Sequence, residues 1–369
     1  MDILSPINML SEVEPLRAAG ATELYCGLMR RETLGEYTSV FPLNSRHVAE
    51  ANVSSFEELA AITAAAHRLG MKLFLTYNAF YTERQFETVK RELPRALDSG
   101  VDGLIVADIA LMIHLKKEFP DAAFIASTLG GAFNSRAARL YRDLGAARVT
   151  LPRHLTVGEI KDVAAACPDV EFEVFIMSER CYFPNALCRF EHATYRVRGG
   201  PLSTLSAAAG RLLGRRAALL TGTYNNRIVN SLQDRFFARN GMMCLREYEA
   251  ELVDAASGAT LRKGLPFRFV DCWNSFREAC GLCAIYDIAR AENVRSLKIV
   301  GRQSLTSKKL ADTDMTRRAL ELLKSNPSRE EFVRAAKKIR RKYYPRYCGG
   351  GYCYYSEPDR AEASRPPGE

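Results

Sequence analysis

The chain has 369 residues, 47% of them apolar, and a formal net charge of +9 at pH 7. This length accommodates two average domains or one α/β barrel with additions, and the apolar share is ample for a large buried core. The sequence has no run of eighteen apolar residues, which excludes a transmembrane helix. Its first residues, MDILSPINML, carry no basic region ahead of the apolar stretch, so we expect no secretory signal. Ten cysteines without such a signal predict reduced thiols and a cytoplasmic location.

Short apolar runs rich in β-forming residues alternate with segments of helical periodicity. The predicted strands are, in chain order, 3–7, 22–28, 71–77, 103–107, 122–127, 147–151, 171–177 and 296–300. Between them, segments such as SSFEELAAITAAAHRLG and TERQFETVKRELPRALDSG combine a capping residue, apolar residues at helical spacing and a closing glycine. Eight strands with intervening helices predict an α/β fold, a parallel (β/α)8 TIM-like barrel within residues 1–303. A doubly wound sheet is the alternative.

More than a hundred residues separate the seventh predicted strand from the eighth, which is far longer than an ordinary connection. We predict a cysteine-bearing insertion at about 178–285, which contains six of the ten cysteines. Because the loops after strand ends build the active sites of barrel enzymes, these cysteines fall on the expected catalytic side. After the barrel we expect a helical extension over 304–345 and a cysteine-bearing, partly disordered tail over 346–369.

Much of the positive charge lies in the last third of the chain, in segments such as SKKLADTDMTRRAL and VRAAKKIRRKYYPRY. Clusters of Lys and Arg beside aromatic residues suit contact with phosphate groups, which favours RNA or another anionic substrate. A solvated helix face would show the same composition, so charge alone leaves both interpretations open.

Polar residues stand at the ends of several predicted strands. Asn78 ends the third, Asp108 the fourth, Arg153 the sixth and Arg302 the eighth. Because the C-terminal ends of barrel strands concentrate recognition groups, we predict that these four residues bind substrate. The two arginines could each grip a carboxylate or a phosphate through two hydrogen bonds. The alternative is that all four cap helices or tie down loops.

Four cysteines stand where a helix start or an irregular loop could aim thiolates into a shared site: Cys181, Cys188, Cys244 and Cys283. Such a set matches the demand of an iron–sulfur cluster, and it also matches structural zinc. A zinc fold normally shows two tight cysteine pairs, whereas only one pair is close in sequence here, which favours a 4Fe–4S cluster. Buried inert thiols are the remaining alternative.

Four further cysteines form a second possible metal site: Cys272, Cys280, Cys348 and Cys353. The segments that carry them, DCWNSFREACGLC and YCGGGYCYY, place glycine beside thiols, and a flexible backbone helps a chain to wrap around a metal. Incidental thiols in a loop and a tail are the alternative.

The segments FEVFIMSERCYFPNALC, CLREY and GLCAIYDIARAENVRSLKIVGR resemble the cysteine-bearing elements of the peptidase U32 (collagenase-like) family. Upstream segments, from ELYCGL to LPRHLTVGEI, extend the resemblance over most of residues 1–320. The family includes proteins of oxygen-independent ubiquinone hydroxylation, which bind a 4Fe–4S cluster through four cysteines, and proteins that hydroxylate RNA bases. Carried over by motif, the resemblance implies that Cys181, Cys188, Cys244 and Cys283 hold such a cluster.

The resemblance implies an oxygen-independent hydroxylase, or a related modifying enzyme, that acts on an RNA base or a small aromatic molecule. Two alternatives follow from the same family: a peptidase, as its name suggests, and a non-catalytic subunit paired with a second family member. The sequence shows neither a Ser–His–Asp pattern nor an HExxH motif, which weakens the peptidase interpretation.

This chain departs from the family pattern in three places. An insertion of about forty residues separates Cys188 from Cys244. A glutamate of the family's KIEGR element is replaced by Val300, and the glutamate of its RE element by His154. Both replacements remove a carboxylate near the expected site, which leaves the identity of the substrate or the reaction open.

Overall fold

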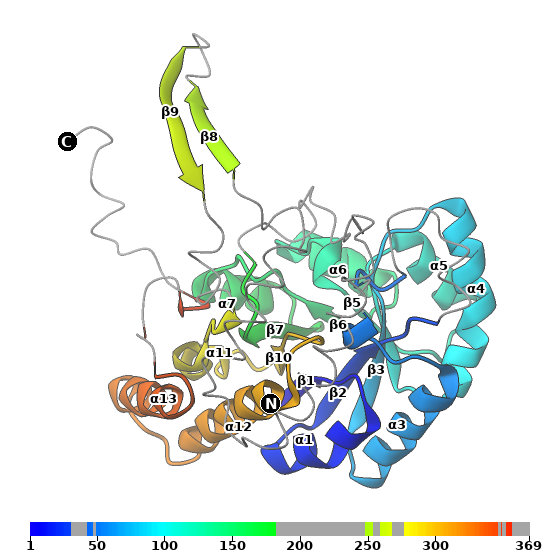
Figure 1. Cartoon of the computed structure of the whole chain (residues 1–369), viewed down its shortest axis with the longest axis horizontal. Helices are drawn as coiled ribbons and strands as arrows, with labels where there is room; N and C mark the ends of the chain where they lie inside the picture. Colours follow the sequence, from blue (N-terminus) through cyan, green and yellow to red (C-terminus); the bar gives the residue numbers. More distant parts are fainter. Residues whose placement is uncertain are drawn as a thin grey trace, which may run out of the picture. The chain divides into compact units, whose positions relative to one another are not determined.

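The computed structural model in Figure 1 describes residues 1–30, 43–46, 49–181, 248–253, 259–267, 277–345, 348 and 352–355. The chain divides into two compact units. One unit combines Met1–Cys188 with Phe276–Glu369, and the other is Arg189–Ser275, which falls inside the predicted insertion.

Eight parallel strands close a barrel in the first unit, in the order β1-β10-β7-β6-β5-β4-β3-β2. The strands are β1 (Asp2–Pro6), β2 (Glu23–Gly27), β3 (Lys72–Tyr77), β4 (Gly103–Val106), β5 (Phe124–Ala126), β6 (Arg148–Thr150), β7 (Glu171–Met177) and β10 (Val294–Ile299). Pairing of β1 with β10, where Leu4 lies opposite Lys298, completes the ring. The predicted (β/α)8 barrel is therefore confirmed, and the doubly wound sheet, which would leave two open edges, is excluded.

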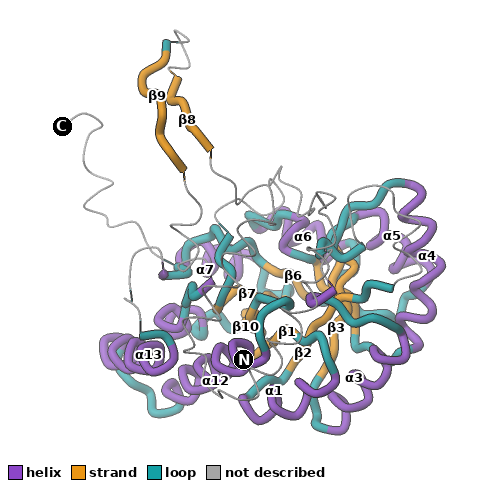
Figure 2. Tube along the Cα trace, viewed as in Figure 1, coloured by secondary structure: helices purple, strands orange, loops and turns teal. Residues whose placement is uncertain are grey.

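Helices follow the strands and cover the outside of the barrel (Figure 2). They are α1 (Val13–Ala19), α3 (Phe56–Arg68), α4 (Glu83–Asp98), α5 (Ile109–Glu118), α6 (Ser135–Asp143), α7 (Val157–Ala166), α11 (Ile285–Ile288), α12 (Thr306–Leu323) and α13 (Arg329–Tyr343). Short 3₁₀ turns are η1 (Leu10–Glu12), η2 (Ala49–Ala51), η3 (Thr128–Gly130) and η5 (Leu282–Ala284). Side chains of Ser55, Thr82 and Thr156 accept hydrogen bonds from the first turns of α3, α4 and α7, because a helix start leaves amide groups without partners.

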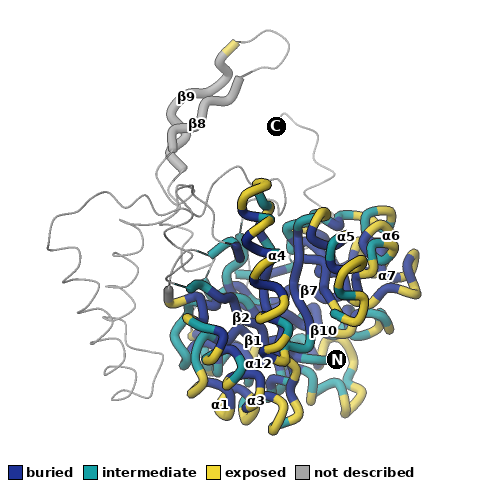
Figure 3. Tube along the Cα trace, turned by 90° about the vertical axis from the view of Figure 1, so that its right-hand side faces the viewer, coloured by how far each residue is buried: buried dark blue, intermediate teal, exposed yellow. Residues whose placement is uncertain are grey.

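The barrel interior contains an apolar layer of Leu4, Tyr25, Phe74, Ile105 and Ile125. The strands that carry these side chains are buried along most of their length, while exposed residues gather on the outer helices (Figure 3). The alternation of side chains along each strand brings every second residue into this interior.

An ionic layer adjoins these apolar side chains, and the sequence did not reveal it. Arg148 donates to both carboxylate oxygens of Glu23, at 2.7 and 2.9 Å. Lys298 donates to Glu173 Oε1 at 2.8 Å, and Thr150 donates to the same oxygen at 2.9 Å. The layer therefore buries two carboxylates with two cations, which keeps its charges matched.

The described part of the second unit is a hairpin of β8 (Tyr248–Val253) and β9 (Thr260–Phe267), with Tyr248 opposite Phe267. Sequence reasoning predicted no strand there. Over the described residues, the helices are all too short or too polar to cross a lipid bilayer.

Candidate functional site

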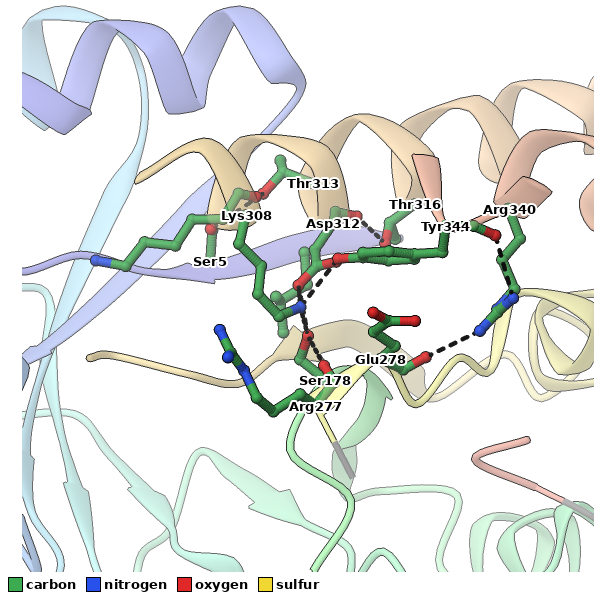
Figure 4. A network of polar contacts seen from close by, with 12 residues as sticks. Ser5, Ser178, Arg277, Glu278, Lys308, Asp312, Thr313, Thr316, Arg340 and Tyr344 are labelled. Atoms are coloured by element: carbon green, nitrogen blue, oxygen red, sulfur yellow. Dashed lines mark hydrogen bonds and ion pairs between the residues drawn. The ribbon is translucent and has the colours of Figure 1, made fainter. Parts of the chain in front are cut away.

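The chain leaves the barrel at the C-terminal end of β7 through two residues in left-handed conformation, Ser178 at φ 66° and Glu179 at φ 40°. A buried polar network fixes this exit (Figure 4). The Ser178 hydroxyl lies 2.5 Å from Asp312 Oδ2 on α12, and Lys308 donates both to that hydroxyl and to Asp312. The first predicted metal ligand, Cys181, follows directly and is partly exposed. Helix α12 therefore positions the start of the cysteine-bearing insertion.

The same network holds the segment by which the insertion returns. The Ser178 hydroxyl also lies 3.1 Å from the Arg277 carbonyl oxygen. Ser178 N donates to Ala279 O, and Gly281 N donates to Ile176 O, both at 2.8 Å. The start and the return of the insertion thus meet at the end of β7. This arrangement brings Cys181 and the Cys280–Cys283 turn to the same end of the barrel.

Four thiols lie on this return segment and on the C-terminal tail: Cys280, Cys283, Cys348 and Cys353. Burial, together with the nearby Cys348 and Cys353, raises the pKa of the Cys283 thiol to about 11. Burial likewise raises the pKa of Cys280 to about 12, with Cys283 and Cys348 as further neighbours. The structure therefore groups Cys283 with three cysteines of the second predicted set.

The predicted ligands Cys188 and Cys244, and Cys272 of the second set, lie outside the described residues. Within the described ranges, no three His, Cys, Asp or Glu side chains are arranged to hold a metal ion. The described thiols suit iron chemically, because soft thiolates are the donors that iron–sulfur clusters use. Both four-cysteine sets remain predictions.

Arg302 is buried at the C-terminal end of the barrel, where its guanidinium joins a strand to a loop. Nη1 donates to Thr76 Oγ1 and Nη2 donates to the Asn44 carbonyl, both at 2.8 Å. A side chain at position 27 would clash, because a Cβ on Gly27 would lie 1.9 Å from Arg302 Nη1. Burial, with a contribution from the nearby Arg46, lowers the pKa of Arg302 to about 10. Arg302 therefore keeps its charge at neutral pH and already makes two contacts within the protein.

Arg153 follows β6 and lies over the barrel end. Its Nη1 donates to the Glu179 carbonyl at 2.5 Å, and its guanidinium carbon lies 4.5 Å from the centre of the Phe175 ring. Phe175 comes from the same face of β7 as Glu173, two residues further toward the C-terminal end. Arg153 is thus placed beside the chain that leads to Cys181.

The other two predicted substrate residues differ in their contacts. Asp108 accepts hydrogen bonds from Leu111 N at 3.0 Å and Tyr81 N at 3.2 Å, so it caps α5 and holds the neighbouring loop. Asn78 follows β3, and its Oδ1 is buried without a hydrogen-bond partner among the described residues. Thr128, which follows β5, has a buried hydroxyl that likewise lacks a hydrogen-bond partner among the described residues. Buried polar atoms of this kind need an explanation, and a bound ligand is one.

Sequence reasoning missed two contributors to this end of the barrel. Arg46 precedes α3 and lies near Arg302, as the repulsion between their charges indicates. Tyr354 comes from the C-terminal tail and stacks on Phe175, with ring centres 6.4 Å apart and planes inclined by 7°. Neither position carried a local signal, because both reach the site only through tertiary structure.

Several proteins of known name are similar to this chain over part of its length. The tRNA hydroxylation protein P of Escherichia coli (strain K12) is 27% identical over 187 residues, which cover 51% of this chain and 38% of that protein. A 23S rRNA 5-hydroxycytidine synthase of the same organism is 29% identical over 149 residues, covering 40% of this chain and 22% of the synthase. The match thus spans less than half of either relative.

A solved structure described as that of the U32 peptidase Mk0906 aligns with a TM-score of 0.36 and 17% identity, over 48% of this chain and 69% of that one. The sequence profile of Peptidase family U32 matches residues 8–200 of this chain. This match covers more than half of its 369 residues and includes β2 to β7 and Cys181. The chain belongs to Peptidase family U32.

Proposed function

We propose that this chain is an iron–sulfur protein that takes part in oxygen-independent hydroxylation of an RNA base. The observation that carries the proposal is the group of arginines at the C-terminal end of the barrel, next to Cys181. Two relatives named for RNA hydroxylation support the choice of reaction and substrate.

Among the described residues, the charged side chains near this end include four arginines and the carboxylate of Glu179: Arg46, Arg153, Arg180 and Arg302. Besides burial, Arg46 and Glu179 both act on the pKa of Arg302, and Arg153, Arg180 and Glu179 act on the pKa of the Tyr354 hydroxyl. An excess of guanidinium groups attracts phosphates and raises the local concentration of an anionic substrate. Guanidinium planes also stack on unpaired bases, which is how many proteins hold single-stranded RNA. The barrel end therefore suits a nucleotide better than an uncharged ring.

We assign the cluster to Cys181, Cys188, Cys244 and Cys283. Cys181 and Cys283 belong to the two segments joined at the end of β7, which fits a site shared between the start and the return of the insertion. A cluster bound there would supply electron transfer, and its burial and hydrogen bonds would set its potential. The protein's own part is to hold the RNA base next to this site and to anchor its phosphates through the arginines.

Metal analysis tests the cofactor. Protein purified without oxygen should contain about four iron and four sulfide per chain, as a 4Fe–4S cluster requires. Cys181→Ser should lose the iron, while Cys26→Ser should keep it, because the Cys26 thiol is fully buried in β2. One equivalent of zinc without iron would contradict the assignment.

Nucleoside analysis tests the reaction. Transfer and ribosomal RNA from cells that lack this protein should miss one hydroxylated nucleoside, and the wild-type chain should restore it during growth without oxygen. Cys181→Ser should not restore it. Identical nucleoside profiles with and without the protein would exclude the proposed reaction.

The second cysteine set is a separate proposal with its own test. If Cys272, Cys280, Cys348 and Cys353 hold another metal, the wild-type chain should contain more metal than one cluster accounts for. Cys348→Ser should then remove only the excess. An unchanged metal content in that variant would exclude the second site.

Two alternatives remain for the family as a whole. If this chain is a peptidase, its Cys181→Ser variant should still cleave collagen or a peptide. A non-catalytic subunit would be inactive alone and would copurify with a second family member. Either result would replace the proposal that this chain carries the activity itself.

A further inference from the structure

The C-terminal tail contributes an ordered segment to the end of the barrel. Cys280 N donates to Tyr352 O, and Tyr354 N donates to Cys280 O, both at 2.9 Å. Cys280 is paired in turn with Met177 at the end of β7. The segment Tyr352–Tyr355 is therefore built onto the barrel through the return segment of the insertion.

Side chains fix the same segment from three directions. Arg180, next to Cys181, donates to the Cys353 carbonyl at 2.8 Å. The Tyr355 hydroxyl donates to the Phe175 carbonyl at 2.6 Å. Arg340 of α13 is buried and its guanidinium lies 5.3 Å from the centre of the Tyr352 ring. Such a set of contacts holds the tail in one position over β7.

Tyr354 occupies the central place in this arrangement. Its ring stacks on Phe175, and Arg153 lies over the Phe175 ring as well. The charged or ionisable groups that act on its hydroxyl are Arg153, Cys181, Arg180 and Glu179. Tyr354 is therefore the aromatic residue of the tail that lies among the groups already assigned to substrate and cluster.

The Tyr354 hydroxyl has no hydrogen-bond partner among the described residues, although the residue is only 1% exposed. A buried hydroxyl without a partner costs free energy, and proteins retain few of them. The neighbouring Tyr355 shows the ordinary solution, since its hydroxyl binds a main-chain carbonyl. The contrast indicates that the hydrogen-bond partner of the Tyr354 hydroxyl is a bound molecule and not a group of the protein.

We propose that Tyr354 contacts the substrate: its hydroxyl forms a hydrogen bond with the edge of an RNA base held at the C-terminal end of the barrel. This inference rests on the proposed function, because it names a residue that recognises that substrate. A phenol hydroxyl can donate or accept, so it can read either kind of group on a base edge. The surrounding arginines bind the attached phosphate and stack on the base.

Two single-atom variants test the inference against a structural role. Tyr354→Phe removes the hydroxyl and keeps the stacked ring, whereas Tyr355→Phe removes a hydroxyl that has a partner inside the protein. Both are compared with the wild-type chain, purified without oxygen, by iron content, thermal melting and titration. The titrant is a transfer-RNA transcript without modified bases, and cytidine and uridine monophosphate are titrated separately.

Tyr354→Phe should keep its iron and melt at or above the wild-type temperature, since it loses no internal hydrogen bond. Its affinity for the transcript or a nucleotide should fall about five- to tenfold, the size expected from one lost hydrogen bond. Tyr355→Phe should show the reverse pattern, with a lower melting temperature and nearly unchanged affinity.

Unchanged affinity of Tyr354→Phe, with normal binding by the wild-type chain, would overturn this inference and leave the proposed function standing. A melting temperature lowered as much as in Tyr355→Phe would also overturn it, because the hydroxyl would then have a structural partner. If the wild-type chain binds neither the transcript nor a nucleotide, the proposed function and this inference both fail.

Discussion

Two polar regions of the same barrel differ in how their charged side chains are balanced. In the interior layer, the carboxylates of Glu23 and Glu173 meet the cations of Arg148 and Lys298 at hydrogen-bonding distance. At the C-terminal end, burial and the positive charge of the nearby Arg46 lower the pKa of Arg302, and the negative charge of Glu179 offsets only part of the lowering. Matched charges serve the fold, because an unmatched buried charge is costly. Among the described residues, positive charge predominates at the end where barrel enzymes bind substrates, which is compatible with the anionic substrate proposed above.

Removing one partner from the interior layer should have the largest effect. Glu173→Gln leaves Lys298 buried beside a neutral side chain and removes one of the carboxylates near Arg148. We expect the free energy of unfolding to fall by about 3–5 kcal/mol, as for other broken buried ion pairs. Urea denaturation measures it.

Glu171→Gln is the matched control for that variant. Glu171 lies on the same strand, but its side chain is 52% exposed and 3.8 Å from Arg148. Its replacement should leave the stability nearly unchanged, because exposed ion pairs contribute little. Equal losses in the two variants would show that the interior layer is not the source of the effect.

The second-largest effect is expected from a substitution in the buried network that positions the insertion. The Tyr344 hydroxyl donates to Asp312 and lies 3.0 Å from Lys308 Nζ, all three side chains being buried. Tyr344→Phe should lower the free energy of unfolding by about 1.5–3 kcal/mol, the range for hydrogen bonds to charged groups. It should also speed proteolysis within the insertion, because Asp312 holds Ser178 at the start of that segment.

Tyr343 provides the control from the adjacent position. Its hydroxyl donates to Asp314 on the same helix α12, but in a partly exposed setting. Tyr343→Phe should therefore destabilise less than Tyr344→Phe and leave proteolysis of the insertion unchanged. The opposite ranking would refute the role assigned to the buried network.

The sequence predicted the barrel because its signals are local. Strand runs are bounded by turns. Ser55 and Thr82 each stand directly before the apolar pattern of the helix that they cap. The ionic layer escaped because Glu23 and Arg148 are 125 residues apart, and a single charge in a strand does not indicate its partner. Tyr354 escaped for a similar reason, since the segment around it gains its position only by pairing with Cys280.

For the site, the strand-end rule selected residues that lie at the C-terminal end of the barrel, but it did not predict the contacts that each of them makes. Arg302 and Asp108 already bind groups of the protein, as the alternative interpretation allowed. Asn78 has a buried oxygen without a partner among the described residues, as a substrate ligand would. Such differences depend on the atoms that surround each side chain, which the spacing of motifs does not contain.

Arg302→Lys separates structure from binding at the C-terminal end. A lysine keeps the charge but cannot bridge Thr76 and the Asn44 carbonyl, so the free energy of unfolding should fall by about 1 kcal/mol. If Arg302 also binds the substrate, affinity for an RNA transcript should fall while the iron content stays constant. A loss of stability with unchanged affinity would assign Arg302 to the fold alone.

The smallest expected effect concerns the salt dependence of RNA binding, and it tests the charge excess itself. If Arg46 neutralises a phosphate, Arg46→Gln should weaken binding and reduce the slope of log affinity against log salt by about one. The reason is that each neutralised phosphate releases bound counterions, so one lost contact releases fewer of them. Arg95→Gln is the control, because Arg95 is an exposed residue of α4 with Glu57 as its neighbour 3.3 Å away. Equal slopes in the wild-type chain and both variants would separate Arg46 from the phosphate contacts. A wild-type slope near zero would go further, because it would show that the arginines at this end of the barrel do not bind RNA phosphates at all.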